Sequence, residues 1–374
     1  MERRTVLLVF GTRPEAIKMG PLVLELKKRP DRFKTVVCVS GQHREMLQQV
    51  LGVFGIEPDR DLEIMKPGQT LTDITTEVLL LLGGVLEEVK PDILLVHGDT
   101  TTTFAAALAA FYRGIPIGHV EAGLRTYNLR SPFPEEFNRQ GTGLLADFHF
   151  APTQKARDNL LQEGKDPERI FVTGNTAIDA LRTTVREDYG HPLLDWVDGH
   201  PLILLTAHRR ENLGAPMREA FRAIRRVLED YPDLRMVYPV HKNPLVQNIA
   251  MEVFCGSDQV RLVPPLDVLD FHNLMARSHL ILTDSGGIQE EAPALGKPVI
   301  VMRDTTERPE GVEAGTLLLA GNTSVEIEGA FRRLLEDPIL YERMSMASNP
   351  YGDGWASSRI ATILEGTSWK TASI

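Results

Sequence analysis

The sequence has 374 residues, of which 43% are hydrophobic and 25% are charged. These values are typical of a globular protein with room for about two domains, and they exclude a largely disordered chain. The formal net charge of −10 argues against general binding to nucleic acids or membranes, so an anionic ligand would need a local cationic pocket.

Short apolar runs alternate with helical segments along the first half of the chain. Strands are predicted at residues 5–10, 36–39, 93–96, 115–119, 148–151 and 170–172, and helices at 43–54, 72–89, 102–112, 154–162 and 177–189. Strands separated by helices of this length predict a parallel sheet covered on both faces. Ligands of such sheets bind beyond the carboxyl ends of the strands, where polar loops lie here at 11–13, 41–43, 97–100 and 119–125.

The loop after the first strand contains a candidate anion site. Pro14 suits the first position of a helix, because its φ is fixed and it lacks an N–H. Arg13 and Lys18 flank that helix start, although either one could simply be a solvated charge. The GxGxxG dinucleotide fingerprint occurs nowhere in the chain, so nothing in the sequence supports bound NAD.

A helix is predicted to begin near Pro132-Phe133-Pro134-Glu135-Glu136. Carboxylates in a first helical turn are favourable for the helix dipole alone, and this is the favoured reading for Glu136. Glu135 is the stronger functional candidate, because two prolines hold its approach rigidly.

A polar connector at residues 190–201 is the best candidate linker, and the alternation restarts after it. Strands are predicted from residue 202 and at 235–240, 260–262, 280–282 and 298–302, with helices at 217–231, after Pro244, at 271–275 and at 288–294. The tail at 331–365 is predicted to be helical. We expect an N-terminal domain at 1–185, joined by a C-terminal helix at about 355–374, and a C-terminal domain at 186–354.

The most informative stretch runs from Leu280 to Glu310. A buried strand ends at Thr283-Asp284-Ser285-Gly286-Gly287, and a helix begins at once, so free N–H groups can bind a phosphate. Arg308, in a later polar loop, could close on the same anion. A simple helix cap is the alternative. The Glu290-Glu291 pair favours the nucleotide, because a carboxylate one turn into the helix suits a ribose hydroxyl.

The two cysteines, Cys38 and Cys255, lie far apart in apolar sequence, which is typical of small core residues in a reducing compartment. No signal peptide is visible at the start, and no run of roughly 18 apolar residues is present to span a membrane. We therefore expect a cytoplasmic protein.

Metal-binding spacings and the GxSxG nucleophile elbow are missing from the sequence, so we expect no metal and no cofactor. The remaining chemistry is proton transfer by carboxylates and a histidine, with cations stabilising a phosphate-bearing leaving group. His208 could equally be an ordinary loop histidine, but its neighbours Arg209 and Arg210 favour a pyrophosphate contact.

Eight ordered motifs carry a resemblance to a known family: GTRPEAIK, HGDT, HVEAGLRT, PFPEEFNR, TAHRREN, PLD…F, TDSGGIQEEAP and TERPE. The chain resembles the non-hydrolysing UDP-N-acetylglucosamine 2-epimerases from about Val6 to about Ile363. The resemblance implies an α/β fold of two facing Rossmann-like domains with a cleft between them, of the GT-B type. It also implies a homodimer that works on UDP-N-acetylglucosamine without a cofactor.

The resemblance further implies a role for individual residues. The catalytic residues would be Asp99, Glu121, Glu135 and His208. UDP would be bound by Arg13, Lys18, His208, Phe271, Ser285, Gly286, Gly287, Glu291 and Arg308. A second, activating UDP-N-acetylglucosamine would be bound by Gln42, His43, Glu136, Arg210 and His241.

The implied reaction expels UDP across C1–C2, leaves a 2-acetamidoglucal, and re-adds UDP with the C2 proton on the other face. The product, UDP-N-acetylmannosamine, would supply cell-surface polysaccharide. Three alternatives remain: a hydrolysing epimerase, a GT-B glycosyltransferase and a catalytically inactive sugar-nucleotide sensor. The missing sugar-kinase domain and the Gln42-His43 pair argue against the first. No acceptor groove is visible for the second. The proton-transfer residues Asp99, Glu121, Glu135 and His208 argue against the third, because a sensor does not need them.

Overall fold

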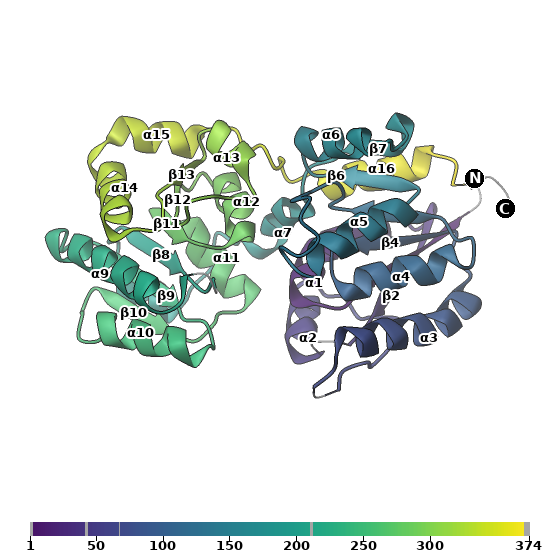
Figure 1. The fold of residues 1–374 in the computed structure, drawn as a ribbon, viewed down its shortest axis with the longest axis horizontal. Coiled ribbons are helices and arrows are strands. Elements are labelled where there is room, and N and C mark those ends of the chain that lie inside the picture. Colours follow the sequence, from purple (N-terminus) through teal and green to yellow (C-terminus); the bar gives the residue numbers. More distant parts are fainter. Residues whose placement is uncertain (1–2, 42–43, 67, 210–211, 370–374) are drawn as a thin grey trace. The chain divides into compact units, whose positions relative to one another are not determined.

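The computed structural model describes residues 3–41, 44–66, 68–209 and 212–369. The chain divides into two compact units. The N-terminal unit comprises Met1–Thr183 and Tyr351–Ile374, and the C-terminal unit comprises Thr184–Pro350. The N-terminal unit is therefore built from two separate pieces of chain, and helix α16 (Ala356–Gly366), yellow in Figure 1, lies among elements from the start of the sequence.

The described part of the N-terminal unit contains a seven-stranded sheet in the order β3-β2-β1-β4-β5-β6-β7. Its strands are β1 (Arg4–Phe10), β2 (Phe33–Val39), β3 (Arg60–Asp61), β4 (Ile93–His97), β5 (Ile117–Val120), β6 (Phe148–Ala151) and β7 (Ile170–Val172). Every neighbouring pair is parallel. The central strands are almost wholly apolar and buried, as expected for a sheet with both faces covered.

The helices of this unit are α1 (Arg13–Lys27), α2 (Arg44–Val53), α3 (Leu71–Val89), α4 (Thr101–Phe111), α5 (Glu135–Leu145), α6 (Gln154–Gln162), the 3₁₀ turn η1 (Pro167–Arg169), α7 (Thr176–Thr184) and α16. Helix α1 packs on α2 and α16, whereas α3, α4 and α5 pack in a row. Helices α1 and α3 begin with capping boxes, Thr12 with Glu15 and Thr70 with Asp73, so both starts are fixed by local sequence.

The C-terminal unit has a parallel sheet that comprises six strands in the described residues, in the order β10-β9-β8-β11-β12-β13. They are β8 (Leu202–Thr206), β9 (Arg235–Pro239), β10 (Val260–Val263), β11 (Leu280–Thr283), β12 (Val299–Val301) and β13 (Leu317–Leu319). Its helices are α8 (Pro192–Val197), α9 (Ala215–Asp230), α10 (Pro244–Phe254), α11 (Val268–Arg277), α12 (Gly286–Ala294), α13 (Pro309–Glu313), α14 (Ser324–Glu336) and α15 (Pro338–Met346). Its core contains Phe221, Tyr238 and Phe331.

Three local predictions were wrong. Helix α7 ends at Thr184 rather than Tyr189, because the Thr184 hydroxyl bonds His272 Nδ1 at 2.7 Å and the Arg186 N–H donates to Asn273 at 2.9 Å. The connector at 190–201 contains helix α8, which starts with Pro192. Cys255, expected in the core, is exposed at the end of α10. Cys38 is buried as expected, and burial raises the pKa of its thiol to about 12.

Both sheets reverse their strand order at one point, and this positions the functional loops. The reversal lies between β1 and β4 in the N-terminal unit and between β8 and β11 in the C-terminal unit. Parallel α/β sheets bind ligands where such a reversal opens the carboxyl edge. Among the described residues, no helix combines the length and the apolar character that crossing a membrane requires.

Candidate active site

Glu121, directly after β5, is a buried acidic side chain held by several polar partners. The residue has a positive φ of 62° and is 6% exposed. Its carboxylate forms an ion pair with Lys18, lies 3.4 Å from Arg139 Nη2 and 3.6 Å from His97 Nε2, and accepts a 3.0 Å hydrogen bond from Asn175. Burial alone would raise the pKa of Glu121, but Lys18, His97 and Arg139 hold the pKa well below its usual range. Glu121 is therefore ionised at neutral pH.

Asp99 lies beside Glu121 because both contact Arg139. The Arg139 guanidinium pairs with the Asp99 carboxylate and donates through Nη1 to the Glu121 carbonyl oxygen at 2.7 Å. The Asn138 side chain donates to the Asp99 carbonyl oxygen at 3.0 Å. The Asp99 side chain remains 28% exposed, whereas that of Arg139 is only 8% exposed. One buried cation thus holds two predicted catalytic carboxylates together and leaves Asp99 the more accessible of the two.

Asn175 connects Glu121 to the segment where the chain returns to the N-terminal unit. Its side-chain amide donates to Glu121, and its backbone N–H donates to the Tyr351 carbonyl oxygen at 2.7 Å. A Cβ on Gly174 would lie 3.3 Å from the Gly352 Cα, so the two backbones are in close contact. The position of Glu121 therefore depends on both pieces of chain that form this unit.

Glu15 organises the loops after β1 and β4. Its carboxylate accepts the N–H groups of Gly11 and Thr12, at 2.9 and 2.7 Å, and the hydroxyl groups of Thr100 and Thr103, at 2.6 and 2.9 Å. The Thr12 hydroxyl completes the capping box. Glu15 thus fixes the loop that carries Arg13 to the loop that carries Asp99.

Glu135 and Glu136 are the first two residues of α5 but occupy different environments. Glu136 is 3% exposed, and its carboxylate accepts the N–H groups of Thr126 and Tyr127, both at 3.0 Å, and the Gln140 amide at 2.7 Å. Glu136 therefore holds a loop in place. Glu135 is half-buried, and the chain leading to it has cis peptide bonds before Pro132 and Pro134.

The start of α12 in the C-terminal unit has the geometry of an anion site. Ser285 is the N-cap, yet its side chain makes no capping hydrogen bond. A Cβ on Gly286 would lie 3.8 Å from Arg209 Nη2 and 3.9 Å from Arg308 Nη2. Two guanidinium groups therefore lie close to the exposed N–H groups of a helix N-terminus, a combination suited to phosphate oxygens.

Buried carboxylates orient the groups around this helix. Arg308 forms an ion pair with Glu290, which is 1% exposed. Glu291 lies 3.6 Å from His272 Nε2 and keeps a partly exposed side chain. Phe271, half-buried on α11, has its ring 6.4 Å from that of His272. The predicted phosphate, ribose and base contacts thus lie on neighbouring elements of one unit.

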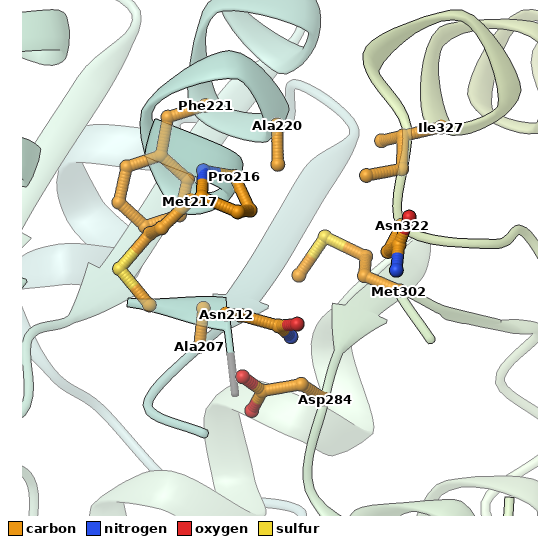
Figure 2. A pocket seen from close by; sticks show the side chains of 10 residues that line it. All are labelled: Ala207, Asn212, Pro216, Met217, Ala220, Phe221, Asp284, Met302, Asn322 and Ile327. Carbon is orange, nitrogen blue, oxygen red and sulfur yellow. The ribbon is translucent and has the colours of Figure 1, made fainter. Parts of the chain in front are cut away.

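His208 follows β8, and its loop is attached to β11 through Asp284. The Asp284 carboxylate accepts the N–H groups of His208 and Arg209, both at 2.9 Å, and lies 3.5 Å from His208 Nδ1. The His208 ring stacks on His241 at 5.5 Å. Asp284 also lines a small pocket, which Figure 2 shows with Asn212, Met217, Phe221 and Met302 around it.

The predicted residues thus fall into one cluster in each unit. Asp99, Glu121 and Lys18 lie together in the N-terminal unit, whereas Ser285, Gly286, Gly287, Glu291, Arg308, Phe271 and His208 belong to the C-terminal unit. Lys18, expected to contact pyrophosphate, is paired with Glu121. Arg13 is half-buried at the start of α1. Of the expected activator residues, Gln42, His43 and Arg210 lie outside the described residues.

Sequence reasoning missed four residues that hold the site: Glu15, Arg139, Asn175 and Asp284. The Thr12-x-x-Glu15 spacing signals a capping box and could have identified Glu15. Arg139 and Asp284 lie inside quoted motifs, PFPEEFNR and TDSGG, without having been given a role. Asn175 has a local role, because its Oδ1 accepts the Ala177 N–H at 3.0 Å at the start of α7. Its contacts with Glu121, 54 residues before it, and with Tyr351, 176 residues after it, have no signal in the local sequence.

The chain is similar to known proteins along almost its whole length. A family model described as UDP-N-acetylglucosamine 2-epimerase matches residues 24–365. The UDP-N-acetylglucosamine 2-epimerase of Bacillus subtilis (strain 168) is 63% identical over 364 residues, which cover 97% of this chain and 96% of that protein.

Two solved structures are similarly close. S. aureus MnaA, in a co-structure with UDP, is 51% identical with a TM-score of 0.90, covering 97% of this chain and 96% of its own. The UDP-GlcNAc 2-epimerase from Neisseria meningitidis, bound to UDP-GlcNAc, is 50% identical with a TM-score of 0.88, covering 96% and 99%. The resemblance drawn from the motifs is confirmed: this chain, with its two Rossmann-like domains of the GT-B type, belongs to the UDP-N-acetylglucosamine 2-epimerase family of enzymes.

Proposed function

We propose that this enzyme interconverts UDP-N-acetylglucosamine and UDP-N-acetylmannosamine without hydrolysis, by elimination and re-addition of UDP. The observation that carries the proposal is the pair of carboxylates, Asp99 and Glu121, held on one buried cation, Arg139. Inversion at C2 requires a proton to leave one face and arrive at the other, and one carboxylate cannot serve both faces. The family match and the relatives solved with UDP or UDP-GlcNAc support the substrate.

In the proposed elimination the C1–O bond breaks, and its electron pair leaves with the UDP oxygen. Positive character at C1 acidifies the C2 proton, a carboxylate accepts that proton, and a C1=C2 double bond forms. In the re-addition a UDP oxygen attacks C1 and a proton reaches C2 from the opposite face. Water is not consumed in either step, so no free sugar is released.

The N-terminal residues would handle the protons. Glu121 is ionised, because Lys18 and Arg139 compensate its burial, so it is available as a proton acceptor or as a stabiliser of positive charge at C1. Asp99 is the more accessible carboxylate and is the group that we propose exchanges protons most readily with substrate. Glu135, half-buried at the start of α5, would be the third catalytic acid.

The C-terminal residues would hold the leaving group. We propose that the α12 N-terminus and Arg308 bind the phosphates, that Glu291 accepts from the ribose hydroxyls, and that Phe271 packs on the base. Charge develops on the leaving pyrophosphate, so fixed N–H and guanidinium donors stabilise the transition state more than the ground state. An activator site, a homodimer, a cytoplasmic location and a role in polysaccharide supply remain predictions.

The decisive experiment is incubation with UDP-N-acetylglucosamine in D₂O, followed by NMR of the sugar. We expect UDP-N-acetylmannosamine carrying deuterium at C2, with the same isotope appearing in recovered substrate. Release of free N-acetylmannosamine would instead identify a hydrolysing enzyme. Failure to turn over would refute the assignment and favour a sensor or transferase.

The carboxylate assignment is tested by Asp99→Asn. We expect turnover to fall by a factor of about 10² or more, because proton transfer is lost, while calorimetric UDP affinity stays close to wild type. Asp31→Asn, at an exposed position of the same unit, is the matched control and should leave both quantities unchanged. Loss of UDP affinity in parallel with turnover would overturn the role given to Asp99.

A further inference from the structure

The carboxylate of Asp284 is buried, and its two oxygen atoms have different environments. The residue is 1% exposed, and it follows β11 at the carboxyl edge of the sheet. Its Oδ2 atom accepts the backbone N–H groups of both His208 and Arg209 at 2.9 Å. These two bonds attach the loop after β8 to the end of β11, next to a Thr206–Thr283 hydroxyl contact of 2.6 Å. One oxygen of Asp284 therefore has a complete structural role.

The other oxygen, Oδ1, takes no part in these two hydrogen bonds. Among the described residues no donor forms a hydrogen bond to it, although it is buried. The pocket that Asp284 helps to line has a volume of about 20 Å³, room for a single water molecule. The other lining side chains are mainly apolar, such as Met217, Phe221 and Met302 (Figure 2). A water in this pocket would not compensate the charge of the carboxylate. A buried carboxylate without a cationic partner is unfavourable.

His208 is the group that can supply that charge. Its Nδ1 atom lies 3.5 Å from Asp284 Oδ1, and its side chain is 41% exposed. With Nδ1 facing the carboxylate, Nε2 lies on the opposite edge of the ring. A protonated imidazole in this position would complete the pairing of Asp284 and present a charge-assisted donor at Nε2.

Two described neighbours of His208, His241 and Arg209, act against its protonation. The His241 ring stacks on it at 5.5 Å and 14°, and Arg209 follows it in the chain. Arg209 is in turn 3.9 Å from Glu307, which offsets part of its charge. In the part of the chain that the structure describes, Asp284 is a carboxylate that faces the ring directly. Its effect must outweigh those of a neighbouring imidazole and a guanidinium.

We propose that Asp284 is a positioning residue that keeps His208 protonated, with Nδ1 toward Oδ1 and Nε2 directed at the departing UDP. This rests on the proposed function for the identity of the leaving group, but the His–Asp pairing itself does not. A charged Nε2–H donor would stabilise the pyrophosphate as the C1–O bond breaks. The pair would thereby act on the leaving group, while Asp99 and Glu121 act on the sugar.

The test is Asp284→Asn, which keeps an oxygen to accept the two backbone N–H groups but removes the negative charge. In protein labelled with ¹³C-histidine, and with the His208 signal assigned by His208→Gln, we expect the His208 titration midpoint to fall by about one pH unit. The matching limb of kcat/KM should move in the same direction, and kcat at neutral pH should fall about tenfold. Asp258→Asn, at an exposed position of the same unit, should change none of these three quantities.

The NMR readout does not require turnover, so it separates this inference from the proposed function. An unchanged His208 midpoint in Asp284→Asn would overturn the pairing even in an active enzyme. If the variant does not fold, the wild-type titration decides alone. His208 must then titrate above the value of about 6.5 for an unperturbed histidine, and a midpoint at or below that value overturns the proposal.

Discussion

Replacing Lys18 by methionine tests the most direct electrostatic relationship in the N-terminal unit. The side chains have similar length, so the change removes a charge and little volume. In the structure the Lys18 side chain is 14% exposed and is paired with Glu121, whose own side chain is 5% exposed. We expect the variant to lose stability and to shift the protonation of Glu121, because Lys18 is foremost among the groups that lower the Glu121 pKa.

The magnitude follows from the burial of both partners. Breaking a buried pair by removing one charge costs about 3–5 kcal/mol, and the lower end applies here because Arg139 and Asn175 still contact Glu121. For a unit of this size, about 3 kcal/mol lowers the melting temperature of the N-terminal unit by roughly 6–12 °C. The Glu121 pKa is depressed in the folded state, so its contribution to stability is present above its ordinary value of 4.5 and is lost as pH falls below it.

Calorimetric melting from pH 8 to pH 4 measures this directly. The gap between wild type and Lys18→Met should be full at neutral pH and should shrink as the pH falls through the Glu121 pKa of the variant, which is higher than that of wild type. The acidic limb of kcat/KM should move to higher pH, because Glu121 becomes easier to protonate. Lys28→Met, at the C-cap of the same helix and with a side chain 72% exposed, is the matched control and should change melting very little.

Isothermal titration with UDP distinguishes this reasoning from a direct pyrophosphate contact. If Lys18 acts through Glu121, UDP affinity in Lys18→Met should remain within about threefold of wild type. A drop of tenfold or more in UDP affinity, with melting unchanged, would refute the pairing and restore Lys18 to the phosphate site.

Three further changes give separate outcomes. Gly286→Ala should fold normally, because the added Cβ would meet Arg209 and Arg308 only at ordinary contact distance. Its calorimetric UDP affinity should fall at least tenfold if a phosphate must approach the Gly286 backbone. Unchanged affinity would exclude a phosphate site at this position. Glu136→Gln should lower stability in chemical denaturation by about 1–3 kcal/mol, because it weakens the hydrogen bonds that the backbone N–H groups of Thr126 and Tyr127 donate to the carboxylate. Normal stability with lost activation by UDP-GlcNAc would instead favour the activator role. Burial alone would raise the Glu307 pKa, but its hydrogen bonds with Arg303 lower that pKa to about 2. The stability advantage of wild type over Glu307→Gln should therefore be present above pH 4.5 and disappear toward pH 2. A stability difference that does not depend on pH would contradict this.

The sheets were predictable because buried parallel strands are continuous apolar runs. Residues 148–151 and 170–172 were predicted as strands and are β6 and β7 with the same bounds. The end of α7 was not predictable from periodicity, since Thr184 and Arg186 leave the helix to bond His272 and Asn273, almost ninety residues later. Local pattern specifies an element, whereas a distant partner decides where it stops.

The same division applies to the candidate site. The glycines and serine of the α12 start could be found from sequence, because a strand, a Gly pair and a helix follow one another in the chain. The pairing of Lys18 with Glu121 and the sharing of Arg139 could not, because these contacts join residues 103 and 18 positions apart. Motifs identify candidate site residues, but only the fold shows that some of them form ion pairs with one another.

The discontinuous N-terminal unit has a consequence for how the protein is made. Residues 1–183 leave the ribosome early, but the Tyr351 carbonyl that contacts Asn175 emerges only after the entire C-terminal unit. At usual rates of synthesis that interval is roughly ten to thirty seconds. During this interval the nascent N-terminal half lacks α16, so the surfaces of β7 and α1 that α16 contacts in the folded protein are still uncovered.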